Sequence, residues 1–306
     1  MQSIHDAFVK HYGCDYLTLT RHIDASYHEG EGIAPHIWAE SFAALIICEL
    51  NLPNTPIIPL APIAFYEHCY RLQETGIIIN VARDLRGQGV RVIISGEALK
   101  WIDNHEAFVK NALEAGWKVT RIDWCIDLVN CGEKVADYQD TYRKYKATQK
   151  DALQEKFYDS NSSTQELGAR ESDIWSKIYE KGKKNGTQED WIRLEMEFKG
   201  GYASQVALQF SQGNHKEICG VSLERYLWLD GTKIYQLLQS FCKGTVPLKL
   251  ESPRKQTDTA KWFNNIVRSA FVKWWRLHPT EAFGWLADLQ NTVDTLKKGG
   301  SETEIE

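Results

Sequence analysis

The chain has 306 residues, of which 43% are hydrophobic and 25% are charged. This composition is typical of a soluble globular protein with one large domain or two ordinary ones, and it excludes an intrinsically disordered chain. No run of about 18 apolar residues occurs, so we expect no transmembrane helix and no membrane partner. The net charge of -5 argues weakly against nucleic-acid binding, which depends more on local patches than on the total charge.

Residues 1–10 contain His5, Asp6 and Lys10 and no apolar run, so we expect no secretory signal and a cytoplasmic location. The seven cysteines are scattered and form no Cys-x-x-Cys pair, which disfavours a disulfide framework or a structural zinc site. The nine histidines form no His-x-His pair and no His-Glu-x-x-His motif.

Apolar periodicity predicts the elements of the first half of the chain. Strands are expected at residues 15–23, 76–81, 90–95 and 117–128. A buried helix is expected at residues 33–50, and a second helix at residues 105–115. The glycine-containing turn at residues 86–89 favours antiparallel pairing of the strands on either side of it.

The second half begins with an expected exposed helix at residues 135–157 and a polar turn at 161–164. Strands follow at residues 175–180 and 191–198. Beyond these, helices are expected at residues 201–210, 223–241, 257–277 and 280–296.

This order of elements predicts an α+β fold with an antiparallel sheet core and a helical C-terminal region. The predicted boundaries give a strand-rich domain at 1–215, a helical region at 216–298 and a flexible tail at 299–306. Residues 243–256, which contain two prolines, are a second candidate linker.

Two of the predicted strands carry acidic side chains on one face. Side chains alternate along a strand, so Arg121, Asp123 and Asp127 share a face opposite three apolar residues. In residues 191–198 (WIRLEMEF), Arg193, Glu195 and Glu197 likewise share a face, and the other face is entirely apolar. Each polar face is therefore either solvated, as is common in antiparallel sheets, or part of a site.

A third predicted strand places Lys177, Tyr179 and Lys181 on one face. Carboxylates spaced along strands suit a hard cation such as Mg²⁺ or Mn²⁺. A tyrosine between lysines suits attack on a phosphodiester, but its phenol has a pKa near ~10 and needs activation. A metal on the scissile phosphate supplies Lewis-acid polarisation, and Lys181 would favour the phenolate.

Four segments in order make this pattern more specific: RIDWCID at 121–127, GARESD at 168–173, IYEKG at 178–182 and RLEME at 193–197. They resemble the RIDxxxD, G-S-R-x-S-D, I-Y-D/N-K-G and R-L-E-x-E motifs of the replication initiation factor family, often called the Rep-trans type. The resemblance covers about residues 13 to 212. The chain departs from the family pattern at Ala169, where serine is usual, and at Glu180, where Asp or Asn is commoner.

The resemblance implies a role for each polar residue. Tyr179 would be the nucleophile, with Lys181 as a second catalytic residue. The predicted metal ligands are Asp123, Asp127, Glu195 and Glu197. The predicted DNA contacts are Arg121, Arg170, Lys177, Lys183 and Arg193.

The resemblance also implies the function. We expect a rolling-circle replication initiator, with residues 1–215 as its catalytic nicking domain, that nicks one strand at an origin. The reaction would be a tyrosine transesterification that forms a 5′-phosphotyrosine link with the help of Mg²⁺ or Mn²⁺. Expected partners are origin DNA, a host helicase or polymerase and a second copy of the chain.

Three alternatives stay open. A relaxase for conjugative mobilisation would use the same chemistry, and a metal nuclease using water would need no nucleophilic tyrosine. A non-catalytic DNA-binding regulator would have solvent-facing carboxylates. Residues 216–298 could serve DNA binding or oligomerisation, because residues 243–276 carry eight basic and two acidic side chains. The aromatic residues among them are equally consistent with a packed amphipathic helix.

Overall fold

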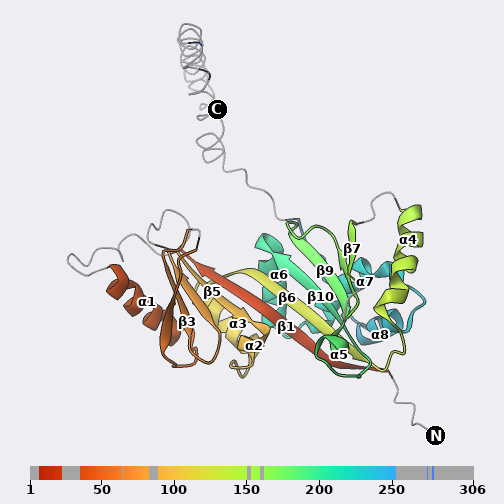
Figure 1. Ribbon diagram of the computed structural model, residues 1–306, viewed down its shortest axis with the longest axis horizontal. Helices are drawn as coiled ribbons and strands as arrows, with labels where there is room; N and C mark the ends of the chain where they lie inside the picture. Colours follow the sequence, from red (N-terminus) through yellow and green to blue (C-terminus); the bar gives the residue numbers. More distant parts are fainter. Residues whose placement is uncertain are drawn as a thin grey trace, which may run out of the picture. The chain divides into compact units, whose positions relative to one another are not determined.

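The computed structural model describes residues 7–22, 35–63, 65–82, 89–149, 153–158 and 162–252, together with Trp274 and His278. The chain divides into two compact units, residues 1–253 and 254–306. The labelled helices and strands of Figure 1 belong to the first unit. The predicted helix at 280–296 and the predicted tail lie outside the described residues, as does the predicted helix at 257–277 apart from Trp274.

The first unit is built on a ten-stranded antiparallel sheet with the order β2-β3-β4-β5-β1-β6-β10-β9-β8-β7. The strands are β1 (Phe8–Arg21), β2 (Ile57–Leu60), β3 (His68–Leu72), β4 (Ile78–Val81), β5 (Val90–Ser95), β6 (Lys118–Val129), β7 (Glu155–Tyr158), β8 (Thr164–Leu167), β9 (Ile174–Glu180) and β10 (Trp191–Lys199). The two longest, β1 and β6, run side by side through the middle of the sheet (Figure 1). This arrangement confirms the predicted α+β class.

The helices are α1 (Pro35–Glu49), α2 (Gly96–Leu99), α3 (His105–Glu114), α4 (Tyr138–Thr148), α5 (Lys181–Lys184), α6 (Gly200–Ser211), α7 (His215–Arg225) and α8 (Lys233–Phe241). Helix α1 packs on β3 and β4, whereas α6 packs on β6 and β10 (Figure 1). Among the described residues, no helix combines the length and the apolar character that crossing a membrane would require.

The apolar faces of β6 and β10 form the centre of the core. Ile122 and Ile126 on β6 are fully buried, as is Phe198 on β10. This face follows from strict alternation in the sequence, and burying it against α6 stabilises the sheet by roughly 1.5–3 kcal/mol for each large side chain. The opposite faces of the same strands therefore carry the polar residues.

Several predicted elements agree with the structure. Strands β4 and β5 pair antiparallel, as the intervening turn indicated. Helix α3 begins after Asn104, whose side chain accepts a hydrogen bond from the Ala107 backbone N–H at 2.9 Å. Gly116 has a φ of 83°, in keeping with the predicted end of this helix.

Other expectations were wrong in their boundaries. The first strand begins at Phe8 rather than at 15, because it pairs with the whole length of β6. The helix predicted at 135–157 ends at Thr148, and residues 155–158 form β7. Its Tyr142 is buried against Trp228, with ring centroids 5.1 Å apart, so α4 is not a fully exposed helix.

The turn predicted at 161–164 leads into a strand, β8, that was not predicted from the sequence. The single helix predicted at 223–241 is two helices, α7 and α8, separated by the segment that contains Gly231 with a φ of 89°. Helix α1 is not wholly buried, since Ile37 and Leu45 are exposed. Both α7 and α8 belong to the first unit.

Candidate active site

Three neighbouring strands bring the predicted site residues together. Across the β6–β10 pair, Asp123 lies opposite Glu197 and Asp127 lies opposite Arg193. Across the β10–β9 pair, Arg193 lies opposite Tyr179, and Lys177 lies opposite Glu195. Residues directly opposite each other in an antiparallel pair have neighbouring side chains on the same face. The sheet thus gathers acids, bases and one tyrosine on its polar face.

The acidic side chains on this face are buried rather than solvated. Asp123, Asp127, Glu195 and Glu197 are each at most 6% exposed. A buried carboxylate needs a charged or hydrogen-bonding partner, because transfer of an unpaired charge out of water costs several kcal/mol. The solvated-face alternative therefore does not hold for these four residues.

Arg121 holds two of the carboxylates. Its guanidinium donates to both carboxylate oxygens of Asp123, at 2.8 and 2.7 Å, and lies 2.7 Å from an oxygen of Glu197. The ring of Tyr16 packs against the same guanidinium, with the ring centroid 4.1 Å away. The second oxygen of Glu197 is 2.6 Å from the ammonium of Lys199.

Arg193 forms the most buried ion pair of the polar face. It donates to both oxygens of Asp127, at 2.6 and 2.7 Å, and its remaining terminal nitrogen lies 2.5 Å from Asp15. Asp15 falls at a β-bulge, since the register of β1 against β6 shifts between Cys14 and Tyr16. Bulges re-aim side chains. Here the bulge adds a carboxylate that the alternation pattern did not predict.

Tyr179 lies at the centre of the group. It is 2% exposed, and its hydroxyl donates a hydrogen bond to Glu195 Oε2 at 3.2 Å. Burial, followed by the negative charge of Glu195, raises the pKa of the Tyr179 phenol well above its ordinary value. In this state the phenol keeps its proton, and the carboxylate beside it is placed to accept that proton.

Three ammonium groups surround the Tyr179 ring. Lys184 is 4.7 Å from the ring centroid, Lys177 is 5.4 Å away and Lys181 is 6.0 Å away. Lys177 also lies 2.6 Å from Glu195 Oε1. Burial and the neighbouring charge of Lys177 lower the pKa of the Lys184 ammonium. Lys184 had no predicted role, and its position at the end of the short helix α5 explains why strand alternation could not find it.

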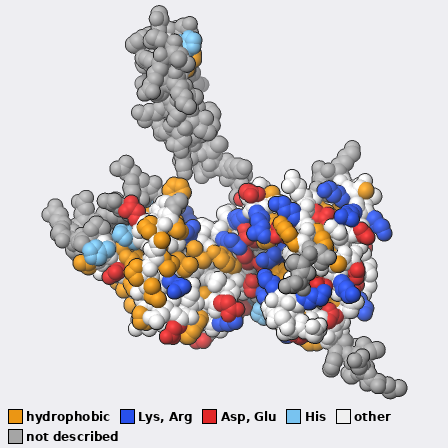
Figure 2. All heavy atoms as spheres, in the orientation of Figure 1, with side chains coloured by type: hydrophobic (Ala, Val, Ile, Leu, Met, Phe, Trp, Pro, Cys, Tyr) orange, Lys and Arg blue, Asp and Glu red, His pale blue; other side chains and the backbone are white. Residues whose placement is uncertain are grey.

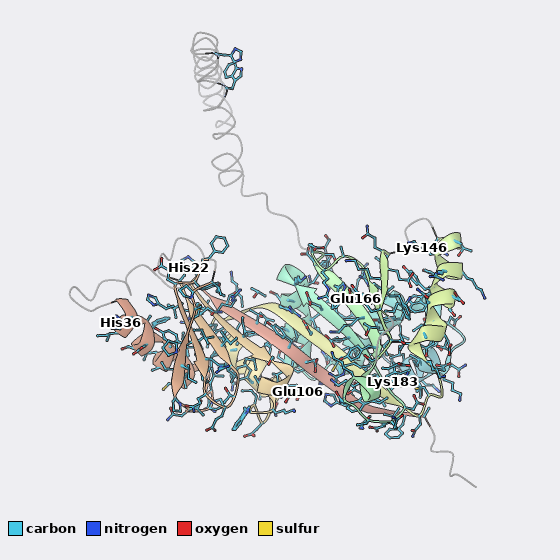
Figure 3. All side chains as sticks on the ribbon, viewed as in Figure 1. His22, His36, Glu106, Lys146, Glu166 and Lys183 are labelled. Carbon is cyan, nitrogen blue, oxygen red and sulfur yellow. The ribbon has the colours of Figure 1, made fainter. Side chains whose placement is uncertain are left out.

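Lys183 does not join this group. It pairs with Glu180 at 2.7 Å, and Glu180 follows Tyr179 in β9, so its side chain belongs to the other face of the strand. Figure 3 shows Lys183 on α5, beyond the end of β9, and Glu166 on β8, beside the middle of β9. Lys183 therefore pairs with a residue on the opposite face of β9 from Tyr179.

Arg170 lies in the turn between β8 and β9. It pairs with Glu166 and stacks on the Trp175 ring at 4.6 Å, while its side chain stays largely exposed. The turn starts at Gly168, whose φ of +87° favours glycine, and a Cβ there would lie 2.8 Å from the Arg225 side chain. At Ala169, where a serine was expected, the backbone carbonyl accepts a hydrogen bond from Ser172 at 2.6 Å.

The surface over these strands is rich in both charges. Figure 2 shows lysine and arginine side chains gathered over β9, β10 and α4, mixed with acidic side chains, whereas hydrophobic side chains are more frequent over α1 and the strands beside it. A mixed surface of this kind can contact phosphates through its exposed bases while it holds acids beneath them.

The carboxylates on this face are of the chemical type that hard divalent cations prefer. In the described part of the chain, no group of three or more His, Cys, Asp or Glu side chains is placed to hold a metal ion. Mg²⁺ commonly takes one or two carboxylates and fills its other positions with water and substrate phosphate oxygens. Asp123, Glu195 and Glu197 offer such carboxylates, but both oxygens of each already contact a cation or the Tyr179 hydroxyl, just as both oxygens of Asp127 contact Arg193. A bound cation would have to displace at least one of these partners.

Burial raises the pKa of Asp123 to about 6, an effect that Glu195 and Glu197 reinforce and Arg121 opposes. A carboxyl group with a raised pKa in the folded state stabilises the fold below its unfolded pKa and loses that contribution as the pH rises to about 6. We therefore expect Asp123→Asn to remove part of the fall in the free energy of unfolding between pH 4 and 6, by up to about 3 kcal/mol. Denaturant unfolding of the wild type and of Asp123→Asn across this pH range measures the difference. Parallel curves of the free energy of unfolding against pH would contradict the prediction.

Neither a family model nor a curated protein matches the chain. The fold resembles that of a rolling-circle replication initiator. The solved structure of such a protein from Geobacillus stearothermophilus matches with a TM-score of 0.54 and 17% sequence identity, over 72% of this chain and 85% of that chain. At this identity the similarity establishes the fold alone. The site therefore has to be argued from its own geometry.

Proposed function

We propose that the protein starts rolling-circle replication by nicking one DNA strand at an origin, with Tyr179 as the nucleophile. The observation that carries the proposal is the Tyr179 hydroxyl 3.2 Å from Glu195, beneath three ammonium groups on the polar face of the sheet. The similarity in fold to an initiator supports it. The burial of the carboxylates disfavours the regulator hypothesis, which expected them to face solvent.

In the proposed reaction the Tyr179 oxygen attacks the scissile phosphorus, and the bond from phosphorus to the 3′ oxygen breaks. The phenol proton passes to Glu195, and the leaving 3′ oxygen takes up a proton to become a hydroxyl. The 5′ phosphate stays on Tyr179 as a phosphodiester, so no nucleotide hydrolysis is needed. Attack by a 3′ hydroxyl on this link reverses the reaction and rejoins the strand.

The cations have separate roles in this proposal. Lys177, Lys181 and Lys184 compensate the charge of the phenolate and the phosphate, which opposes the effect of burial on the Tyr179 pKa. Arg170 and Arg121 contact the DNA backbone. Arg193 positions Asp127 and Asp15 through its ion pairs rather than facing DNA.

Asp123 with Glu195 or Glu197 would hold Mg²⁺ or Mn²⁺. When bound, such a cation polarises the scissile phosphate and stabilises the charge that develops on it. Asp127 is the most buried of the four predicted ligands, at 1% exposed, and Arg193 engages both of its oxygens. The proposed initiator would also act with a second copy of the chain and with a host helicase or polymerase.

Covalent capture tests the proposal. The protein is incubated with Mn²⁺ and single-stranded oligonucleotides from the replicon's own DNA, and the products are separated on a denaturing gel. A protein band shifted by attached DNA is the expected result. Cleavage without such a band would identify water as the nucleophile and overturn the role of Tyr179. A relaxase would give the same band but would cleave at a transfer origin rather than a replication origin.

Metal binding can be measured apart from cleavage. We expect Mn²⁺ to bind the wild-type protein and to bind at least about tenfold more weakly to Asp123→Asn and Glu195→Gln, because each loses an anionic oxygen. Titration calorimetry or the electron paramagnetic resonance signal of free Mn²⁺ reports this affinity. Glu166→Gln is the matched control, since Glu166 is a buried carboxylate that pairs with Arg170 and is not one of the predicted ligands. Equal weakening in all three variants would contradict the assignment.

Substitutions of the neighbouring residues Lys183 and Lys184 test whether a cation close to the Tyr179 ring stabilises the phenolate. We expect Lys184→Ala to lower the rate of adduct formation by about 10- to 100-fold, since removing a nearby cation disfavours the phenolate. Lys183→Ala should lower it by less than about threefold, because Lys183 pairs with Glu180 on the other face. Single-turnover kinetics at several pH values measures both, and equal effects would rule out the distinction.

A further inference from the structure

A second candidate site lies away from Tyr179, in a cavity of about 420 Å³. Its walls come from α4, the start of β9, β10, α6, α7 and the segment 248–250. Met196 lines it, and Met196 belongs to the apolar face of β10, opposite the face that carries Glu195. The cavity and the candidate active site are therefore on opposite faces of the sheet.

Arg225 is a half-buried cation in this cavity, and no acidic side chain among the described residues pairs with it. Its side chain donates to Ser176 Oγ at 3.2 Å and to the backbone carbonyls of Ile174 at 3.0 Å and Leu167 at 3.4 Å. These neutral acceptors tie Arg225 to the β8–β9 turn, and they use donors of Nε and of one terminal nitrogen. Within the described residues, the other terminal nitrogen has no hydrogen-bond acceptor. A guanidinium held this way, with its charge uncompensated, favours an anion.

Aromatic side chains form another part of the wall. Trp228, which is 5% exposed, lines the cavity, and its indole Nε1 is enclosed by the protein. Tyr145 and Tyr202 add aromatic rings to the wall, and Lys249 adds a second cation.

We propose that this cavity binds a nucleotide: a nucleobase against the aromatic wall and its phosphate on Arg225 and Lys249. The volume lies within the usual range for small-molecule sites, roughly 300–1,000 Å³. Aromatic side chains stack on any base, and an arginine with free donors binds a phosphate. Glu224, also in the wall, accepts hydrogen bonds from a ribose hydroxyl or an exocyclic amine. The proposal does not depend on the nicking reaction, because the cavity shares no residue with the Tyr179 group.

The test is titration calorimetry on the full-length protein with the nucleoside monophosphates and, separately, inorganic phosphate. We expect at least one nucleotide to bind, and inorganic phosphate to bind at least tenfold more weakly. Lys249→Glu should weaken nucleotide binding at least tenfold, and Lys243→Glu, an exposed lysine outside the cavity, should not. Arg225→Gln keeps a donor for the turn and should weaken binding similarly. Tyr179→Phe should bind like the wild type, which separates this site from the proposed nicking activity.

Competition with single-stranded DNA identifies the source of the nucleotide. If an oligothymidylate displaces the bound mononucleotide, the cavity takes an unstacked nucleotide of a DNA strand. If both bind together, the cavity takes a free nucleotide. Absence of nucleotide binding at millimolar concentration would overturn the proposal, as would binding that Lys249→Glu and Lys243→Glu change equally, or inorganic phosphate binding as tightly as the nucleotides.

Discussion

Replacing Tyr179 with phenylalanine is expected to abolish formation of the covalent protein–DNA adduct and to lower strand cleavage by at least about a thousandfold. The substitution removes the one oxygen that the proposed reaction joins to phosphorus, and no other tyrosine hydroxyl in the described part of the chain donates a hydrogen bond to Glu195. The ring and its packing against the three lysines remain, so the fold should be retained. Denaturing gels of single-turnover reactions with Mn²⁺ measure adduct and cleavage separately.

The matched control is Tyr158→Phe. Tyr158 lies on β7 of the same sheet, but it is 48% exposed and far from Glu195 in strand order. This variant should form the adduct at the wild-type rate. Full cleavage by Tyr179→Phe would exclude the proposed nucleophile. Loss of activity in both variants would indicate damage to the sheet rather than to the chemistry.

Replacing Arg193 with methionine is expected to lower the free energy of unfolding by about 3–5 kcal/mol. The change leaves Asp127, which is 1% exposed, without the guanidinium that engages both of its oxygens. An uncompensated buried carboxylate is costly because water no longer solvates it. Urea unfolding followed by fluorescence or circular dichroism measures the loss.

A second substitution separates charge from packing. Adding Asp127→Leu to Arg193→Met removes the unpaired carboxylate and should recover most of the lost stability, whereas Asp15, which is 30% exposed, can still be solvated. Lys10→Met breaks an exposed pair with Glu189 and should change stability by less than about 1 kcal/mol. If Arg193→Met proves equally mild, Asp127 must find another partner, and the ion pair contributes little.

The sequence was informative where alternation was strict. Strands β6 and β10 have one apolar and one charged face, and both were predicted to within a residue or two of their ends. The outer strands were missed because they are short and irregular. Strand β2 contains Pro59, which a sheet tolerates near its edge, and β8 begins at the last residue of the predicted turn and buries the polar residues Gln165 and Glu166.

The candidate site was predicted in part for the same reason. Alternation placed Tyr179 and Lys177 on one face of β9, and the register then brought that face beside Glu195. Asp15 could not be predicted, because a bulge breaks the regular alternation of side chains along β1. Lys183 and Lys184 are adjacent in sequence, and the helical turn that begins after Glu180 decides which of them approaches Tyr179.

The ion pairs of Arg193 connect parts of the chain that are far apart along it. Asp127 is 66 positions from Arg193, and Asp15 is 178 positions away. Closing loops of this length costs entropy before any contact compensates it, so contacts between distant residues form slowly. Local hairpins such as β4–β5 and β8–β9 can form early, but the polar face is complete once β1, β6 and β10 are aligned. The group around Tyr179 therefore assembles late in folding, and a chain still in synthesis lacks it until β10 has emerged.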